Sequence, residues 1–229
     1  VASTARNHLA SQISNTLHFI GQGRDRFIAS RNQMAGDGAG ITSRNIVPFD
    51  VDGTLMANAT GLSSSGTFFG QSGNFEGNVR QLVVGDFNLQ HDSASDSTAA
   101  TLTSRIVWER MLSDDTMFGY FVGGQLAHSD MGGSFSGTQN RLGLTAGAHV
   151  ISTLRDRLFL SGFVSFGADR NDVNLRNSAV RMHGEYTTST ATIGASLSGV
   201  IDFEDYEIWP EIILHHGHTN IGIIGLTES

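Results

Sequence analysis

From Phe49 onward, apolar and polar residues alternate along the chain with a period of two. The alternation is cleanest at Arg141–Val150, where the even positions are apolar and the odd positions are Arg, Gly, Thr, Gly and His. A period of two places successive side chains on opposite faces of a β-strand. The pattern predicts eight strands, at 49–59, 79–90, 100–112, 116–128, 141–150, 158–170, 187–203 and 206–219.

The predicted strands are long, and the segments between them alternate in length. A strand of about 12 residues, at about 3.3 Å per residue and a tilt of about 45°, spans the ~25 Å apolar band of an outer-membrane barrel. Globular strands average about 5–6 residues. Tight turns are predicted at 113–115, 155–157 and 204–205, and long polar loops at 91–98, 129–139 and 170–185. Short turns on one side and long loops on the other are typical of an up-and-down membrane barrel.

The N-terminal part of the chain follows a helical period. Apolar residues recur every three or four positions over 3–34, which predicts an amphipathic helix: Leu9, Ile13, Leu17, Ile20, Phe27 and Ile28. Ser3 or Thr4 is a candidate N-cap, and Gly36 with Gly38 ends the helix. An amphipathic helix packed on a soluble core and a coiled coil both fit this segment taken alone.

Composition supports a structure that is apolar on one face. The 229 residues are 39% hydrophobic and 16% charged, with 28 Gly and 2 Pro. A membrane barrel needs apolar side chains only toward lipid. There is no Cys, which excludes disulfides and thiolate metal sites, and the net charge of -8 argues against a nucleic-acid partner. No stretch approaches the roughly 18 consecutive apolar residues of a membrane-spanning helix.

Residues 116–219 resemble the translocator domain of autotransporters, the proteins of type V secretion. The Gly-rich strand Arg141–Val150, the turn Leu154–Arg157 and the strand Leu158–Asp172 follow the family's order. A Thr-rich entry then leads into the Ala/Ser/Leu strand Gly184–Gly199, and Ile208-Trp209-Pro210 matches a Trp/Ile-Xaa-Pro element. The resemblance covers about half of the chain.

The resemblance implies a mainly β protein, an antiparallel up-and-down transmembrane β-barrel with an N-terminal amphipathic helix in its pore. Such barrels have twelve strands and end on an aromatic residue, whereas this chain shows about eight strands and ends in Thr-Glu-Ser. We therefore expect residues 1–40 to be a pore or linker helix and 41–229 a C-terminally incomplete barrel, with about four more strands after Ser229. An eight-stranded closed barrel is the alternative.

The alternation also predicts which side chains face the lumen and which meet the helix. Lipid-facing positions are expected at Leu142, Leu144, Ala146, Val150, Ile193, Leu197 and Ile201. Lumen-facing positions are expected at Arg141, Thr145, His149, Thr192 and Ser196. Contacts between a helix plug and the barrel wall are expected among Arg6, Arg24, Arg31, Asp86, Glu109 and Asp202.

No pattern in the sequence predicts catalysis or a cofactor. His216 and His218 share a strand face and could bind a metal, but polar residues at a barrel mouth explain them better, so no metal is expected. Asn7, Asn15 and Asn32 are isolated, so the Asn-Asn pair at which some family members cleave themselves is missing.

The predicted protein is not an enzyme. It is an outer-membrane translocator that exports and tethers an N-terminal passenger, with outer-membrane lipid, the barrel-assembly machinery and the passenger as partners, in the outer membrane of a Gram-negative cell. The alternatives are a porin-like or adhesive outer-membrane barrel without a passenger, and a soluble secreted β-sandwich that mediates interactions.

Overall fold

The computed structural model describes residues 21, 23, 24, 27, 28, 50–58, 61–72, 79–132, 136–177, 180–203, 207–222 and 225–228. The protein is mainly β. Its strands are β1 (Asp50–Asn58), β2 (Gly61–Ser72), β3 (Val79–Asp92), β4 (Ser97–Ser113), β5 (Thr116–Met131), β6 (Ser136–Arg155), β7 (Leu158–Arg176), β8 (Arg181–Gly199), β9 (Ile201–Asp202), β10 (Glu207–Ile208), β11 (Glu211–Ile221) and β12 (Gly225–Glu228).

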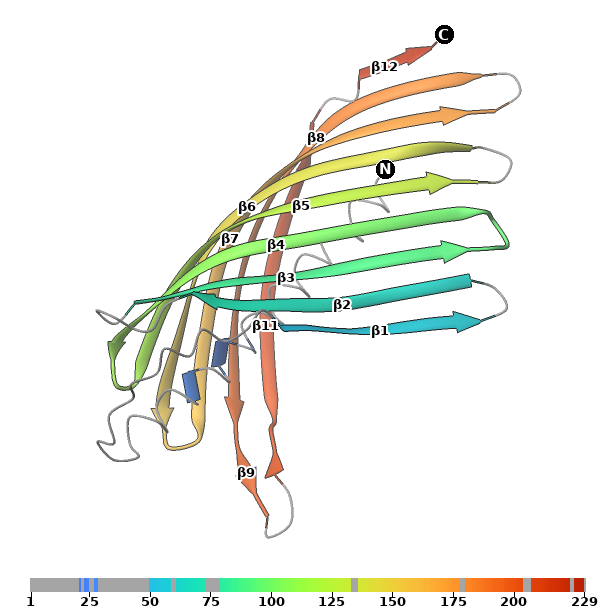
Figure 1. The fold of residues 1–229 in the computed structure, drawn as a ribbon. Helices are drawn as coiled ribbons and strands as arrows, with labels where there is room; N and C mark the ends of the chain where they lie inside the picture. The colour runs from blue at the N-terminus through green and yellow to red at the C-terminus, as the bar shows by residue number, and fades with distance from the viewer. Residues whose placement is uncertain are drawn as a thin grey trace.

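The strands form one curved antiparallel sheet in which neighbours in sequence are neighbours in space (Figure 1). The order is β1-β2-β3-β4-β5-β6-β7-β8-β11, and β12 also pairs with β8, beyond the end of β11. β9 and β10 form a separate two-stranded hairpin between β8 and β11. In the described part of the chain no strand joins β1 to β11, so the sheet is open. The up-and-down antiparallel order agrees with the prediction.

All eight predicted strands are present, and the sequence missed two. β2 has the sequence Gly-Leu-Ser-Ser-Ser-Gly-Thr-Phe-Phe-Gly-Gln-Ser, in which no apolar alternation can be recognised. It nevertheless pairs with β3 along its whole length. The four-residue β12 was also not predicted.

The prediction of long loops was wrong for the described residues. β3 continues to Asp92 and β4 begins at Ser97, and β7 and β8 likewise extend to Arg176 and from Arg181. The composition of these extensions is typical of loops, yet their backbones pair across the strands. Polar side chains support this pairing through cross-strand hydrogen bonds such as those of His91 with Thr98 and of His183 with Asn174. The tight turns at Asp114–Asp115 and Asp156–Arg157 are where the sequence placed them.

Glycines on the sheet accept aromatic rings from the strand beside them. Phe121 lies over Gly147 and Phe163 over Gly194, and each pair is directly opposite in register. A Cβ at Gly147 would be 2.5 Å from the Phe121 ring, and one at Gly194 would be 2.3 Å from the Phe163 ring. An aromatic side chain that covers a cross-strand glycine compensates for its missing side chain. The high Gly content is therefore part of the packing of this sheet.

Of the helix predicted over 3–34, the structure describes Gly21, Gly23, Arg24, Phe27 and Ile28, all in helical conformation. The rest of that prediction lies outside the described residues. Phe27 is fully buried against Met117, Ile151 and Phe159. We call the face of the sheet that Phe27 contacts the inner face, and the opposite face the outer face.

Candidate functional site: the two faces of the sheet

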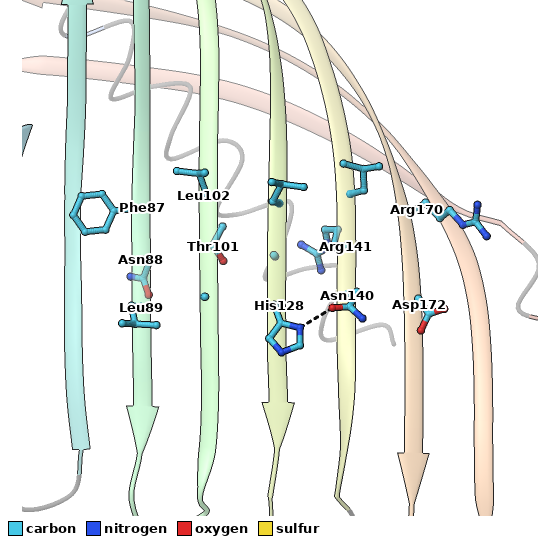
Figure 2. Close-up of a pocket in the computed structure, with 14 residues that line it drawn as sticks. Phe87, Asn88, Leu89, Thr101, Leu102, His128, Asn140, Arg141, Arg170 and Asp172 are labelled. Carbon is cyan, nitrogen blue, oxygen red and sulfur yellow. Dashed lines mark hydrogen bonds between the residues drawn. The ribbon is translucent and has the colours of Figure 1, made fainter. Parts of the chain in front are cut away.

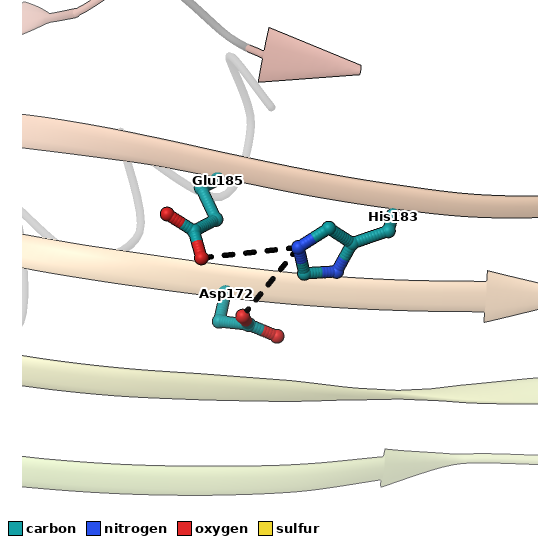
Figure 3. A group of neighbouring side chains, drawn as sticks. All are labelled: Asp172, His183 and Glu185. Atoms are coloured by element: carbon teal, nitrogen blue, oxygen red, sulfur yellow. Dashed lines mark ion pairs between the residues drawn. The ribbon is translucent and has the colours of Figure 1, made fainter. Parts of the chain in front are cut away.

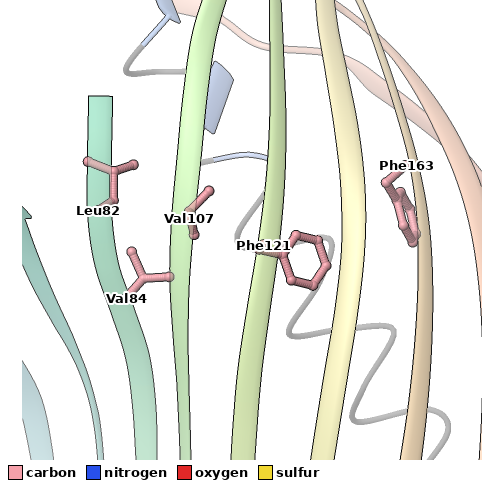
Figure 4. Packing of buried hydrophobic residues seen from close by; sticks show 5 residues of the cluster. All are labelled: Leu82, Val84, Val107, Phe121 and Phe163. Atoms are coloured by element: carbon pink, nitrogen blue, oxygen red, sulfur yellow. The ribbon is translucent and has the colours of Figure 1, made fainter. Parts of the chain in front are cut away.

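From β3 to β8 the inner face is largely buried, yet most of its buried side chains are polar. Its apolar part consists of two clusters. One crosses β3, β4, β5 and β7 and is formed by Leu82, Val84, Val107, Phe121 and Phe163 (Figure 4), and the other is the cluster of Met117, Ile151 and Phe159 with Phe27. Around them, in the described strands, lie buried polar or charged side chains: Arg80, Thr103, Arg105, Glu109, His149, Ser161, Ser165, Asp169, Asn171, Thr188, Thr190, Thr192, Ser196 and Ser198. Buried charged and polar groups are informative because burial is costly unless each group has partners.

The outer face has the opposite character, since it is exposed and apolar. Large hydrophobic side chains on it stand between 37% and 73% exposed. They come from β4, β5, β6, β7, β8 and β11: Leu102, Ile106, Phe118, Tyr120, Val122, Leu126, Leu142, Leu144, Val150, Leu160, Phe166, Ile193, Leu197, Ile212 and Leu214. We call this continuous surface the apolar belt. A water-soluble sheet that packs on one side would bury such a face.

The apolar belt has a definite height. On β6 it runs from Leu142 to Val150, which is about 26 Å along a strand and about 19 Å along an axis inclined by about 45°. Near the tight turns, Trp108 and Tyr120 stack on the outer face with ring centroids 5.2 Å apart. Trp and Tyr are the residues enriched where lipid meets water.

The structure places all five residues expected to face a lumen on the inner face. His149, Thr192 and Ser196 are buried there, and Arg141 and Thr145 are half-buried. Arg141 Nε donates to Asn171 Oδ1 at 3.0 Å across β6 and β7. Thr192 forms a hydrogen bond with Ser165.

A charged cluster lies within the inner face on one register row. Arg80 donates from Nε and Nη2 to Glu109 Oε2 at 2.9 and 2.5 Å, and His149 Nε2 lies 3.5 Å from Glu109 Oε1. Glu109 is fully buried. Between Glu109 and His149 the row passes Gly119, where a Cβ would lie 2.2 Å from His149 Cε1. Because Gly119 has no side chain, the imidazole of His149 can extend across β5 toward Glu109.

The helical segment is held at the turn end of the inner face. Besides the burial of Phe27, Arg24 Nη1 forms an ion pair with Glu211 Oε1 at 3.3 Å. The Arg24 guanidinium also lies 5.7 Å from the centre of the Trp209 ring. These contacts join the helical segment to the first residues of β11 as well as to β5, β6 and β7.

The expected pairs between the helix and the barrel wall stay a prediction. Among the described contacts, Arg24 forms an ion pair with Glu211, an acid that was not among those expected. Glu109 binds Arg80 of the neighbouring strand. The negative charge of Asp86 favours the charged form of Arg105. Arg6 and Arg31 lie outside the described residues, and of Asp202 only the backbone pairing with Glu207 is described.

Beyond the apolar belt, toward the loops, the outer face becomes polar. A hollow of about 610 Å³ opens where the apolar belt meets this polar surface, and Leu102, Leu142 and Arg170 are among the residues that line it (Figure 2). His128 Nδ1 lies 2.6 Å from Asn140 Oδ1 at its rim, and His128 Nε2 lies 3.2 Å from Asp130 Oδ2.

The same rim contains a group of ligand-type side chains that the sequence did not indicate. Asp172 on β7 lies beside His183 and Glu185 on β8, with their ligand atoms within 4.8 Å of one another (Figure 3). The histidines considered from the sequence, His216 and His218, lie on β11 opposite Ile193 and Ala191 of the apolar belt.

No protein family matches this chain, and neither a curated protein nor a solved structure matches it. Among the residues that the structure describes, no helix has the length and apolar character needed to cross a membrane.

Proposed function

We propose that this chain is an outer-membrane β-barrel translocator, which anchors and exports a passenger attached on its N-terminal side. One observation carries the proposal: the exposed face of the sheet is apolar while the buried face is polar and charged. In a soluble domain the distribution would be the reverse. In a membrane barrel the exposed face meets lipid and the polar face lines the lumen.

The geometry of the sheet is consistent with this proposal. Strands of 14 to 20 residues from β3 to β8 are long enough to cross an apolar layer and to project beyond it. A sheet in lipid must also have no free edges, because unpaired backbone groups are costly there. The proposal therefore requires strands that close the gap between β1 and β11.

The translocator function, rather than a simple pore, is supported by the helical segment. Phe27 is buried on the inner face, and Arg24 binds Glu211 beside it. A helix in this place fills the lumen and would keep the membrane sealed after export. A porin-like barrel would need an open lumen instead.

The membrane part of the proposal is tested by the position dependence of a charge. Val122 and Leu126 lie on the outer face of β5, at the middle and at the loop-side edge of the apolar belt, and are 47% and 54% exposed. In lipid, Val122→Arg is expected to cost about 2–4 kcal/mol and Leu126→Arg about 0–1 kcal/mol. Urea unfolding in lipid vesicles measures both. Equal costs below about 0.5 kcal/mol, as for surface substitutions of a soluble protein, would refute the membrane proposal.

The plug is tested by planar-bilayer conductance. Deleting residues 1–35 from the full-length barrel is expected to raise single-channel conductance sharply, whereas the intact protein conducts little. Unchanged conductance would refute the plug and favour the porin-like alternative.

A further inference from the structure

The rim group on β7 and β8 has the chemistry of a metal site. His183 Nε2 lies 4.0 Å from Asp172 Oδ2 and 3.8 Å from Glu185 Oε1. The three side chains are 32% to 46% exposed, so ions in solution can reach them. We infer that Asp172, His183 and Glu185 bind one divalent cation of the zinc class through these three atoms, with a fourth position open to water.

The tautomer of His183 follows from its neighbours. Asn174 Nδ2 donates to Asp172 Oδ1 at 2.7 Å, which leaves Asn174 Oδ1 as an acceptor. His183 Nδ1 lies 2.7 Å from that oxygen, so Nδ1 carries the hydrogen and donates. The lone pair of a neutral imidazole is then on Nε2, the nitrogen that faces both carboxylates. This is the arrangement that metal-binding histidines need.

The two carboxylates are oriented in the same way. Asp172 Oδ1 is held by Asn174, and Glu185 Oε2 accepts a hydrogen bond from Arg170 Nη2 at 2.9 Å. In each carboxylate the other oxygen therefore points to the shared space. Every ligand residue has its non-ligating atom fixed by a second partner, which is how metal sites keep their ligands in place.

The spacing and the donor set point to zinc. Ligand atoms about 2.0–2.2 Å from a tetrahedral zinc are about 3.3–3.6 Å apart, so small side-chain rotations close the observed distances around an ion. One imidazole with two carboxylates is a donor set that zinc accepts, whereas calcium and magnesium prefer oxygen alone. The site joins β7 and β8 near the loop that connects them. The inference does not depend on the proposed membrane function.

Calorimetry with Zn²⁺ on the full 229-residue chain, in detergent micelles, tests the inference. We expect one saturable site, with affinity lowered at least tenfold by His183→Ala and by about 10–100-fold by Asn174→Ala. His128→Ala is the matched control, because His128 also faces an amide and an acid on the same rim but lacks a second carboxylate. It should leave the affinity unchanged.

Co²⁺ provides a second readout that a structural role alone would not change. A four-coordinate Co²⁺ absorbs strongly in the visible range, and this absorption should appear with the unsubstituted chain and disappear with His183→Ala. Circular dichroism verifies that each variant folds. Absence of saturable Zn²⁺ binding, or equal affinity of the unsubstituted chain and His183→Ala, would overturn the inference.

Discussion

Glu109 provides the sharpest test of the inner face, because a carboxylate with no exposed surface is stable only with its partners. Arg80 donates two hydrogen bonds to Oε2, and His149 lies beside Oε1. Arg80 itself is 5% exposed. Replacing Glu109 by Ala would remove from the buried guanidinium the carboxylate that accepts two of its hydrogen bonds.

The expected cost follows from that burial. Breaking a buried ion pair by removing one partner costs about 3–5 kcal/mol, whereas an exposed pair contributes about 0–1 kcal/mol. The pair Arg170–Glu185 is the matched exposed case, since it also joins neighbouring strands, at 2.9 Å. We therefore expect Glu109→Ala to lose about 3–5 kcal/mol of unfolding free energy and Glu185→Ala no more than about 1 kcal/mol.

Urea unfolding in detergent micelles, followed by tryptophan fluorescence, measures both variants, with a metal chelator present because Glu185 is also an inferred metal ligand. The double variant Arg80→Met/Glu109→Leu removes both charges and should recover most of the loss, because apolar replacements of a buried pair are close to neutral or stabilising. If Glu109→Ala costs no more than Glu185→Ala, water reaches the inner face and the argument for a buried charged cluster fails.

Two further predictions concern the packing of β5 and the polar rim. Gly119→Ala should cost about 1–3 kcal/mol, because its Cβ would overlap His149, whereas Gly124→Ala should cost little, since its nearest contact would be at 3.7 Å; urea unfolding compares them. The hydrogen bond to Asn140, together with Asp130, raises the pKa of His128, so its stabilising contribution is complete below the unfolded pKa of about 6.5 and is lost as pH rises through the folded pKa. A histidine NMR titration should show that Asn140→Ala lowers this pKa toward its ordinary value, and an unchanged pKa would contradict the assigned cause.

The strands could be predicted wherever one face is uniformly apolar. At Leu142, Leu144 and Ala146 the alternation survives because every second side chain belongs to the apolar belt. β2 was not predicted because Ser and Gly occupy both of its faces, and its pairing with β3 depends on tertiary structure that the local pattern does not encode. The extensions of β7 and β8 were not predicted because polar residues lie on both of their faces.

The rim group could not be predicted, because it depends on register. Asp172 is 11 residues before His183, and only the pairing of Asp172 with Glu185 and of Asn174 with His183 brings these side chains together. A shift of one residue would turn one set to the inner face. His216 and His218 can be recognised in the sequence as a neighbouring pair on one strand face. In the structure, however, the residues opposite them on β8 are Ile193 and Ala191, which cannot bind a metal.

The low hydrophobic fraction of the chain and its β fold are reconciled by where the apolar residues lie. An ordinary β-sandwich needs an apolar interior between two sheets, and this sheet instead has Ser, Thr, Asp and Asn over most of its buried face. Its two apolar clusters lie in the turn half of that face. A second sheet stacked on the inner face would meet these polar and charged side chains instead of an apolar surface, whereas the helical segment brings both Phe27 and Arg24 to apolar and charged neighbours. The distribution of polarity thus argues against two sheets packed face to face around an apolar interior.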